Sequence, residues 1–91
     1  MFYLVSYDIP DDKRRTKLAK AIRDFGDRIQ YSVFECILDD SLLVEMTERI
    51  RSIIDTTEDS VRIYTICGSC RKQVEIIGQG DISRIEDVYI V

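Results

Sequence analysis

The sequence feature that most constrains the fold is an apolar strand that runs into a carboxylate. Phe2–Asp8 alternates as a β-strand does, and Pro10 ends it because proline has no backbone N–H to donate to a sheet. Asp11 or Asp12 is placed to cap a helix that follows. We therefore expect Asp8 at the carboxyl end of a buried strand, facing the first turn of a basic helix. Such strand ends are common places for ligands in α/β layers.

Both faces of this strand are largely apolar. One face carries Phe2, Leu4, Ser6 and Asp8, and the other carries Tyr3, Val5 and Tyr7. Helices can cover one face of a small sheet, so something else must cover the second face. A chain of 91 residues buries only roughly 60–65% of its unfolded surface. We therefore expect a second subunit to provide that cover.

The next segment, Asp11 to Phe25, has the pattern of an amphipathic helix. Its apolar stripe lies at i, i+3, i+4 and i+7 and consists of Leu18, Ala21, Ile22 and Phe25. Gly26 is placed to stop this helix. Arg14 falls on the stripe and Arg15 near its edge, where lone charges are not buried. We expect both to reach towards Asp8, and a plain structural salt bridge to Asp8 is the alternative.

The remaining pattern predicts one further helix and several strands. One long strand is expected from Arg28 to Leu38, because no glycine, proline or asparagine marks a turn inside it. The helix is capped by Asp39 or Asp40 and runs to about Asp55, and the later strands are Val61–Cys67, Gln73–Ile77 and the tail Val88–Val91. An unpaired apolar tail would be an exposed strand edge that is prone to aggregate, so we expect it to pair with this sheet or with that of a neighbouring subunit. This order predicts one α+β domain, with two helices on one face of a mainly antiparallel sheet.

Charge is distributed unevenly along the chain, whose net charge is −4. Residues 1–29 contain seven basic and five acidic side chains, whereas residues 39–61 contain seven acidic and two basic ones. One end of the molecule is therefore locally cationic and suited to an anionic partner. The alternative interpretation is that these are solvated helix faces that keep the protein soluble.

The complete absence of histidine excludes several kinds of site. It removes the commonest general acid or base and the commonest transition-metal ligand. Any phosphodiester cleavage would therefore depend on metal-activated water held by carboxylates. No apolar run approaches the ~20 residues of a membrane span, and a strand that begins at Phe2 leaves no room for a signal peptide. We expect a cytoplasmic protein.

Several motifs together resemble one known family. They are Tyr7-Asp8-Ile9 at a strand end, Arg15 in the next helix, and Phe25-Gly26-x-Arg28-x-Gln30-x-Ser32-Val33-Phe34-Glu35. This combination resembles the CRISPR-associated protein two family. The resemblance implies a single ferredoxin-like βαββαβ domain over residues 1–91, in which the segment predicted as one long strand is divided into two. It also implies a homodimer with facing sheets and an added C-terminal strand, about residues 86–91, that pairs with the partner subunit.

The resemblance also implies a function in CRISPR adaptation, that is, spacer acquisition for defence against viruses and plasmids. Members of the family are described as metal-dependent endonucleases that act on single-stranded RNA or double-stranded DNA. Asp8 matches the metal-binding aspartate, contributed by both protomers, for a divalent cation such as Mg²⁺ or Mn²⁺. The positions associated with catalytic activity are matched by Tyr7, Arg15, Arg28 and Phe34.

A non-catalytic role is the alternative within the same family. Its members also form the central scaffold of the spacer-integration complex, between dimers of the larger adaptation integrase. For that role the useful residues are Arg14, Arg15, Lys17 and Arg28, which can track a duplex backbone without reading bases. Lys17 occupies a position where some members have arginine. A lysine keeps the positive charge but lacks the planar guanidinium that can bind a phosphate through two hydrogen bonds. An alternative from another class is a ferredoxin-like ligand-binding or regulatory module.

The cysteines form a CxxC, Cys67-Gly68-Ser69-Cys70, with Cys36 elsewhere in the chain. A structural zinc site takes four ligands, so one protomer falls short, although a dimer brings two such pairs. A redox CxxC normally opens a helix, whereas this one is predicted to lie between strands. We therefore expect reduced free thiols.

Overall fold

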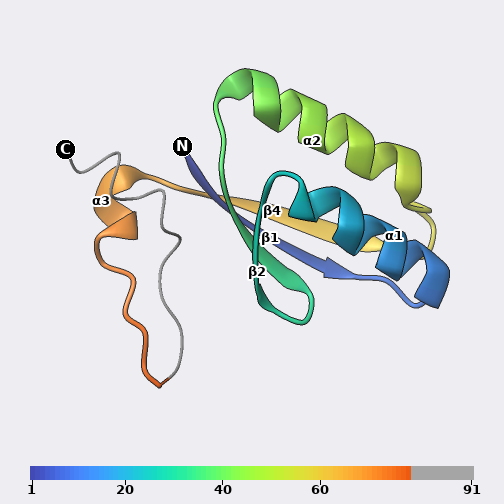
Figure 1. Ribbon diagram of the computed structural model, residues 1–91, viewed down its shortest axis with the longest axis horizontal. Helices are drawn as coiled ribbons and strands as arrows, with labels where there is room; N and C mark the ends of the chain where they lie inside the picture. Colours follow the sequence, from blue (N-terminus) through green and yellow to red (C-terminus); the bar gives the residue numbers. More distant parts are fainter. Residues whose placement is uncertain (79–91) are drawn as a thin grey trace.

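The computed structural model describes residues 1–78 and forms one sheet with two helices packed on it (Figure 1). The elements in chain order are β1 (Phe2–Asp8), α1 (Asp12–Arg23), β2 (Gly26–Gln30), β3 (Val33–Ile37), α2 (Asp40–Ile53), β4 (Ser60–Ile66) and the short α3 (Gly68–Arg71). The four strands lie in the order β2-β3-β1-β4, and every neighbouring pair is antiparallel. This arrangement confirms the predicted α+β class and the βαββαβ order.

The first strand, β1, lies in the interior of the sheet. It pairs with β3 on one side, where Phe2 lies opposite Ile37, and with β4 on the other, where Phe2 lies opposite Ile66. Pro10 follows the strand directly, and Asp11 caps α1 by accepting a 2.8 Å hydrogen bond from the Arg14 N–H. The predicted strand and helix start are therefore confirmed.

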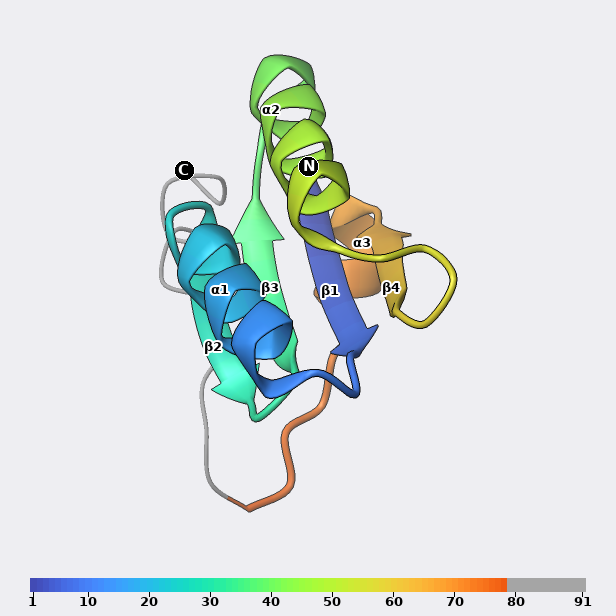
Figure 2. The same cartoon turned by 90° about the vertical axis from the view of Figure 1, so that its right-hand side faces the viewer.

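One face of the sheet is covered by α1 and α2 and contains the core (Figure 2). Its buried side chains come from both the sheet and the helices: Tyr3, Val5, Tyr7, Phe34 and Cys36 from the strands, and Leu18, Ala19, Ile22, Met46 and Ile50 from the helices. Six of these have no exposed surface: Val5, Leu18, Ile22, Phe34, Cys36 and Met46. We call this face the helix face. Of the stripe predicted for the first helix, Leu18 and Ile22 are buried and Phe25 packs against the core. Ala21 is not part of the core, and Ala19, which was not predicted, is buried in its place.

The opposite face, which we call the open face, is not covered by α1 or α2. Strand register places Leu4 opposite Glu35 and Tyr64 there, and Ser6 opposite Val33 and Arg62. Among the helices of residues 1–78, α3 alone lies on this side (Figure 2), where the Arg71 guanidinium is 4.6 Å from the centre of the Phe2 ring. Within residues 1–78 the chain therefore completes one face of its sheet and leaves most of the other uncovered.

The segment expected as one long strand, Arg28 to Leu38, is two strands, so that local prediction was wrong. The chain turns at Tyr31 and Ser32, and the β2–β3 register shifts between Arg28 and Gln30. The Tyr7 N–H donates a 3.1 Å hydrogen bond to the Ser32 carbonyl, so a contact distant in sequence stabilises a turn that has no glycine or proline. The division implied by the family resemblance is confirmed.

Gly26 has a different role from the one predicted. The helix ends earlier, at Arg23 with Asp24 as its C-cap, and Gly26 begins β2. A Cβ atom at Gly26 would lie 2.2 Å from the Glu35 carbonyl oxygen. Glycine is therefore required for the close approach of β2 to β3, rather than for stopping the helix.

The chain after β4 also differs from the prediction. Gly68-Ser69 begins α3 instead of a turn between strands, and Gln73–Ile77 is not a strand within the described chain. Hydrogen bonds from the Gln73 and Val74 N–H groups to the carbonyls of Cys70 and Arg71 continue the helical turn instead. The strand expected near residues 86–91 lies outside the described residues. No helix within residues 1–78 is long and apolar enough to cross a membrane.

Candidate metal and nucleic-acid site

Asp8 lies at the exposed end of β1, on the open face. It lines a hollow of about 230 Å³ together with Ser6, Tyr7, Ser60, Arg62 and Tyr64. Within residues 1–78 its carboxylate forms no hydrogen bond or ion pair. Asp8 therefore ends the strand, as predicted, but lies on the open face instead of facing the first turn of the basic helix, as was expected. Ligand binding by Asp8 stays a prediction.

Strand pairing brings a cation and hydroxyl groups into the Asp8 hollow. Asp8 lies opposite Ser60, and Ser6 lies opposite Arg62, so all four side chains belong to one face. A hydrogen bond with Tyr64 raises the pKa of Arg62, which keeps the guanidinium charged. Sequence reasoning missed these β4 residues, because only the β1–β4 register shows which of them share a face with Asp8.

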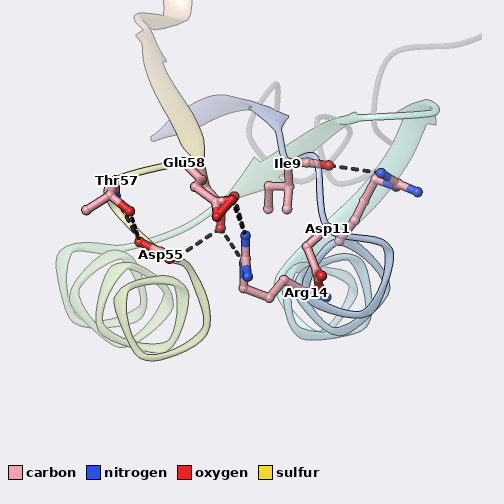
Figure 3. Close-up of polar contacts among 8 residues, drawn as sticks. Ile9, Asp11, Arg14, Asp55, Thr57 and Glu58 are labelled. Atoms are coloured by element: carbon pink, nitrogen blue, oxygen red, sulfur yellow. Dashed lines mark hydrogen bonds and ion pairs between the residues drawn. The ribbon is translucent and has the colours of Figure 1, made fainter.

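Arg14 does not reach Asp8, contrary to expectation. Its Nε and Nη2 donate hydrogen bonds of 2.8 Å and 3.1 Å to the two carboxylate oxygens of Asp59, and Glu58 is 3.8 Å away. Figure 3 shows Arg14 extending from α1 towards the loop that carries Asp55 and Glu58. The Asp59 side chain has no exposed surface, and its hydrogen bond with Arg14 lowers the pKa of that carboxyl group. Arg14 therefore ties α1 to the loop before β4.

Arg15 approaches the end of β1 but contacts its backbone rather than Asp8. Its Nη1 donates a 2.9 Å hydrogen bond to the Ile9 carbonyl, and its Nη2 pairs with Asp12. The alternative interpretation, a salt bridge of Arg14 or Arg15 with Asp8, is therefore wrong for the described residues. The bond to Ile9 fixes the guanidinium beside the strand end.

Arg28, Tyr7 and Phe34 form one cluster on the helix face. The Arg28 Nη2 donates to the Tyr7 hydroxyl at 3.3 Å, and that hydroxyl donates to the Tyr31 carbonyl at 3.3 Å. The guanidinium lies 5.5 Å from the Phe34 ring centre and 5.6 Å from that of Tyr31. Because Tyr7 and Phe34 are buried, they position Arg28 and do not present a surface of their own.

A second hollow of about 230 Å³ lies between α1 and β2. Its lining contains four cationic side chains and no acidic one: Arg15, Lys20, Arg23 and Arg28, with Thr16, Ala19 and Tyr31. We call it the cationic hollow. Lys17 lies on the adjoining surface of α1, which it shares with Lys13 and Lys20. Four cations around one concavity make its electrostatic potential locally positive.

The structure thus divides the predicted site residues between two faces. Asp8 lies on the open face, whereas Tyr7, Phe34 and Arg28 lie on the helix face beside Arg15. Lys20 and Arg23 belong to the cationic hollow but were not predicted, although their helical spacing from Lys17 and Arg15 is a signal that was available.

The donor set around Asp8 suits a hard divalent cation only in part. Within residues 1–78 no group of three or more histidine, cysteine, aspartate or glutamate side chains could hold a metal ion. The hollow offers the Asp8 carboxylate and the hydroxyls of Ser6 and Ser60. Mg²⁺ takes oxygen ligands and usually keeps several waters, so it needs few protein ligands. The residues fit such an ion if a second Asp8 or substrate oxygens complete the site.

Comparisons with known proteins give a consistent result. The family model described as CRISPR associated protein Cas2 matches residues 1–74. "CRISPR-associated endonuclease Cas2 2" of Thermus thermophilus is 44% identical over 98% of this chain and 94% of its own length. "CRISPR-associated endoribonuclease Cas2 1" of Chloroflexus aurantiacus is 44% identical over 100% of both chains.

Solved structures agree with this result. Streptococcus pyogenes Cas2 superposes with a TM-score of 0.76 at 36% identity, covering 86% of this chain and 100% of that one. A chain of a partial Cas6-RT-Cas1–Cas2 complex gives a TM-score of 0.74 at 29% identity. That match covers 84% of this chain and 89% of the other.

Proposed function

The chain belongs to the CRISPR-associated protein Cas2 family, and from this premise we propose that it is a metal-dependent endonuclease of CRISPR adaptation. The observation that carries the proposal is the position of Asp8. Its carboxylate lies at an exposed strand end, has no partner within residues 1–78, and shares a hollow with Arg62. Relatives named endonuclease and endoribonuclease, each 44% identical to this chain, support the same reaction.

The proposed active form is a homodimer that joins two open faces. Leu4, Val33 and Tyr64 contribute apolar surface to that face, and Tyr64 is 46% exposed. Covering this surface gains free energy at roughly 25 cal/mol per Å² of apolar area buried. The family resemblance implies, and we propose, that one Asp8 from each protomer lies near the dimer axis. That arrangement supplies the second carboxylate that one chain lacks.

The proposed cofactor is Mg²⁺ or Mn²⁺, held by Asp8 of each protomer. Such an ion, when bound, lowers the pKa of a water molecule and offsets charge that develops on the phosphate. Arg62 lies in the same hollow as Asp8, where its guanidinium can hold a non-bridging phosphate oxygen by a charge-assisted hydrogen bond. The hydroxyls of Ser6 and Ser60 add neutral hydrogen-bonding groups to the same site.

The cationic hollow is the proposed path of the nucleic acid strand on each protomer. Arg15 and Arg28 are held in place by the Ile9 carbonyl and the Tyr7 hydroxyl, so they present fixed guanidinium groups. Lys17 adds charge on the adjoining surface. In this proposal Tyr7 and Phe34 are positioning residues for Arg28. Arg14 is assigned to stability instead, because Asp59 engages its guanidinium.

A second candidate function is a duplex-binding scaffold that does not cleave. The observation that favours it is the separation of the cationic hollow from Asp8 by the sheet, which allows backbone binding without chemistry. The structural similarity to a chain of a Cas1–Cas2 complex supports dimers of the Cas1 integrase as partners. The cations of α1, doubled in a dimer, would then follow the phosphates of a duplex.

The metal-dependence of cleavage tests the first function. Wild type, Asp8→Asn and Asp40→Asn are incubated with single-stranded RNA and double-stranded DNA, with Mg²⁺, Mn²⁺ or excess EDTA. We expect Asp8→Asn to lower the cleavage rate at least about 100-fold, as loss of a group that stabilises transition-state charge does. Asp40→Asn removes the same charge from the exposed start of α2 and should leave the rate unchanged. Equal cleavage by Asp8→Asn, or in EDTA, contradicts the metal mechanism.

The salt dependence of binding tests the scaffold function. We expect Lys20→Ala combined with Arg23→Ala to reduce the slope of log binding constant against log salt by about 1–2 per protomer. Duplex binding by Asp8→Asn should retain the wild-type slope. If the double variant binds with an unchanged slope, the cationic hollow does not contact phosphates.

A further inference from the structure

Two thiols, Cys67 and Cys70, meet in the first turn of α3. Both are exposed, and neither takes part in a disulfide. The Cys67 Sγ accepts a hydrogen bond from the Cys70 N–H at 3.4 Å and lies 3.2 Å from the Ser69 Oγ. Cys67 is in extended conformation and caps the helix, so its sulfur folds back over the backbone that carries Cys70. The sequence-based prediction that this CxxC lies between strands was wrong.

We propose that Cys67 and Cys70 form a redox-active dithiol, which low-molecular-weight disulfides oxidise reversibly to an intramolecular disulfide. The proposal goes beyond phosphodiester cleavage and scaffolding, since it uses no residue of the Asp8 hollow or the cationic hollow. It identifies a modification site on the chain and the chemical class of its reactant. It adds reversible oxidation to the expectation of reduced free thiols.

The two cysteines have different roles in the exchange. The Ser69 hydroxyl, the Cys70 N–H and the Cys70 thiol donate to the Cys67 sulfur and lower its pKa to about 7. The same contact with Cys67 raises the pKa of Cys70. Near neutral pH Cys67 is therefore the thiolate that attacks, and Cys70 is the thiol that resolves.

The reaction balances in two steps. The Cys67 thiolate attacks one sulfur of a disulfide RSSR, which forms a Cys67–SR bond and releases RS⁻. Cys70 then loses its proton to solvent and its sulfur attacks Cys67, which forms the Cys67–Cys70 bond and releases the second RS⁻. Counted from the fully protonated dithiol, which first loses the Cys67 proton to form the thiolate, the protein loses two electrons and two protons. RSSR gains the two electrons, and the two RS⁻ ions take up two protons from solvent to become two thiols. Excess RSH reverses both steps.

Cys36 provides an internal reference for this reactivity. Its side chain has no exposed surface and belongs to the core on the helix face. Burial, with smaller contributions from Asp27 and Glu35, raises the pKa of its thiol to about 11. One folded chain therefore contains both a buried thiol, expected to be inert, and the proposed reactive pair. The reactivities of the two kinds of thiol can be compared in the same sample.

Mass spectrometry of the full chain in glutathione buffers tests the proposal. Over a range of ratios of oxidised to reduced glutathione, we expect wild type to lose two hydrogens and to carry no glutathione. Cys70→Ser should instead stop at a glutathione adduct on Cys67, and Cys67→Ser should form no intramolecular disulfide. Wild type that stays fully reduced over this range overturns the proposal, as does a disulfide that includes Cys36.

Alkylation by iodoacetamide tests the assignment of the attacking thiol. In the folded protein we expect Cys67 to react at least tenfold faster than Cys36 at pH 7, with a rate that rises around that pH. Ser69→Ala should move the midpoint to higher pH, because it removes the first donor to the sulfur. In denaturant all three cysteines should react alike. Equal rates for Cys67 and Cys36 in the folded state, or protection of both α3 thiols that a zinc chelator relieves, contradict the proposal.

Discussion

The two faces of the sheet differ in how far a single chain completes them. On the helix face, α1 and α2 bury Val5, Phe34 and the other core residues. The ion pair of Arg14 with Asp59 also joins α1 to the loop before β4. On the open face, Tyr64 is 46% exposed and Asp8 lies at the rim. The packed core is therefore concentrated on one side of the sheet. Asp8 and the apolar surface proposed for dimer assembly lie on the other side, whereas the cationic hollow lies with α1 on the helix side.

The largest expected difference between the two faces is in the stability lost when either of two consecutive β3 residues is truncated. Phe34 has no exposed surface and faces the helices, whereas Val33 is half-buried and faces the open side. We expect Phe34→Ala to lower the free energy of unfolding by about 3–5 kcal/mol. Val33→Ala should cost about 1 kcal/mol or less in dilute, monomeric protein. Urea denaturation followed by circular dichroism measures both, and equal losses would show that the open face is also a core in the monomer.

A charge on the open face tests whether this face joins two subunits. We expect Val33→Lys to retain the fold and to raise the dimer dissociation constant at least about 10-fold, because a charge must be desolvated at the contact. Analytical ultracentrifugation over a dilution series measures this constant. Val5→Lys, the same change on the helix face, should prevent folding. A Val33→Lys protein that dimerises like wild type removes the open face from the proposed interface.

The smallest expected effect concerns acid stability on the helix side. Arg14 lowers the pKa of Asp59, so the folded state binds fewer protons at this carboxyl group than the unfolded chain does. The resulting stabilisation is complete above the unfolded pKa of about 3.9 and is lost as the pH falls through the lower folded value. We expect Asp59→Asn to destabilise the protein at pH 7 and to flatten the loss of stability below pH 4. Thermal unfolding across pH 2–7 measures this, and an unchanged acid profile would mean that another carboxylate dominates.

Much of the fold follows from local sequence signals. The alternation of Phe2–Asp8, the stop at Pro10 and the caps Asp11 and Asp39 act over a few residues, and all are confirmed. The turn at Tyr31 and Ser32 was missed because its stability comes from pairing with β1 rather than from turn-forming residues. The short helix α3 was missed because the glycine of Cys67-Gly68-Ser69-Cys70 is equally typical of a turn.

The site was less predictable than the fold, because its contacts are distant in sequence. The partner of Arg14 lies 45 residues further along the chain, and no local pattern connects the two. Arg62 joins Asp8 through the β1–β4 register, which a single sequence does not reveal. By contrast, the exposed strand-end position of Asp8 was predictable, since it depends only on where the strand stops.

The interior position of β1 also has a consequence for synthesis of the chain on the ribosome. β1 is the first strand to emerge, yet both of its partners, β3 and β4, are made later, and its Phe2 pairs with a residue as distant as Ile66. Until then the nascent chain carries an apolar strand with two unsatisfied edges, which is an aggregation hazard. Contacts so distant in sequence also slow folding. Expression at lower temperature or with added chaperones should therefore raise the soluble yield.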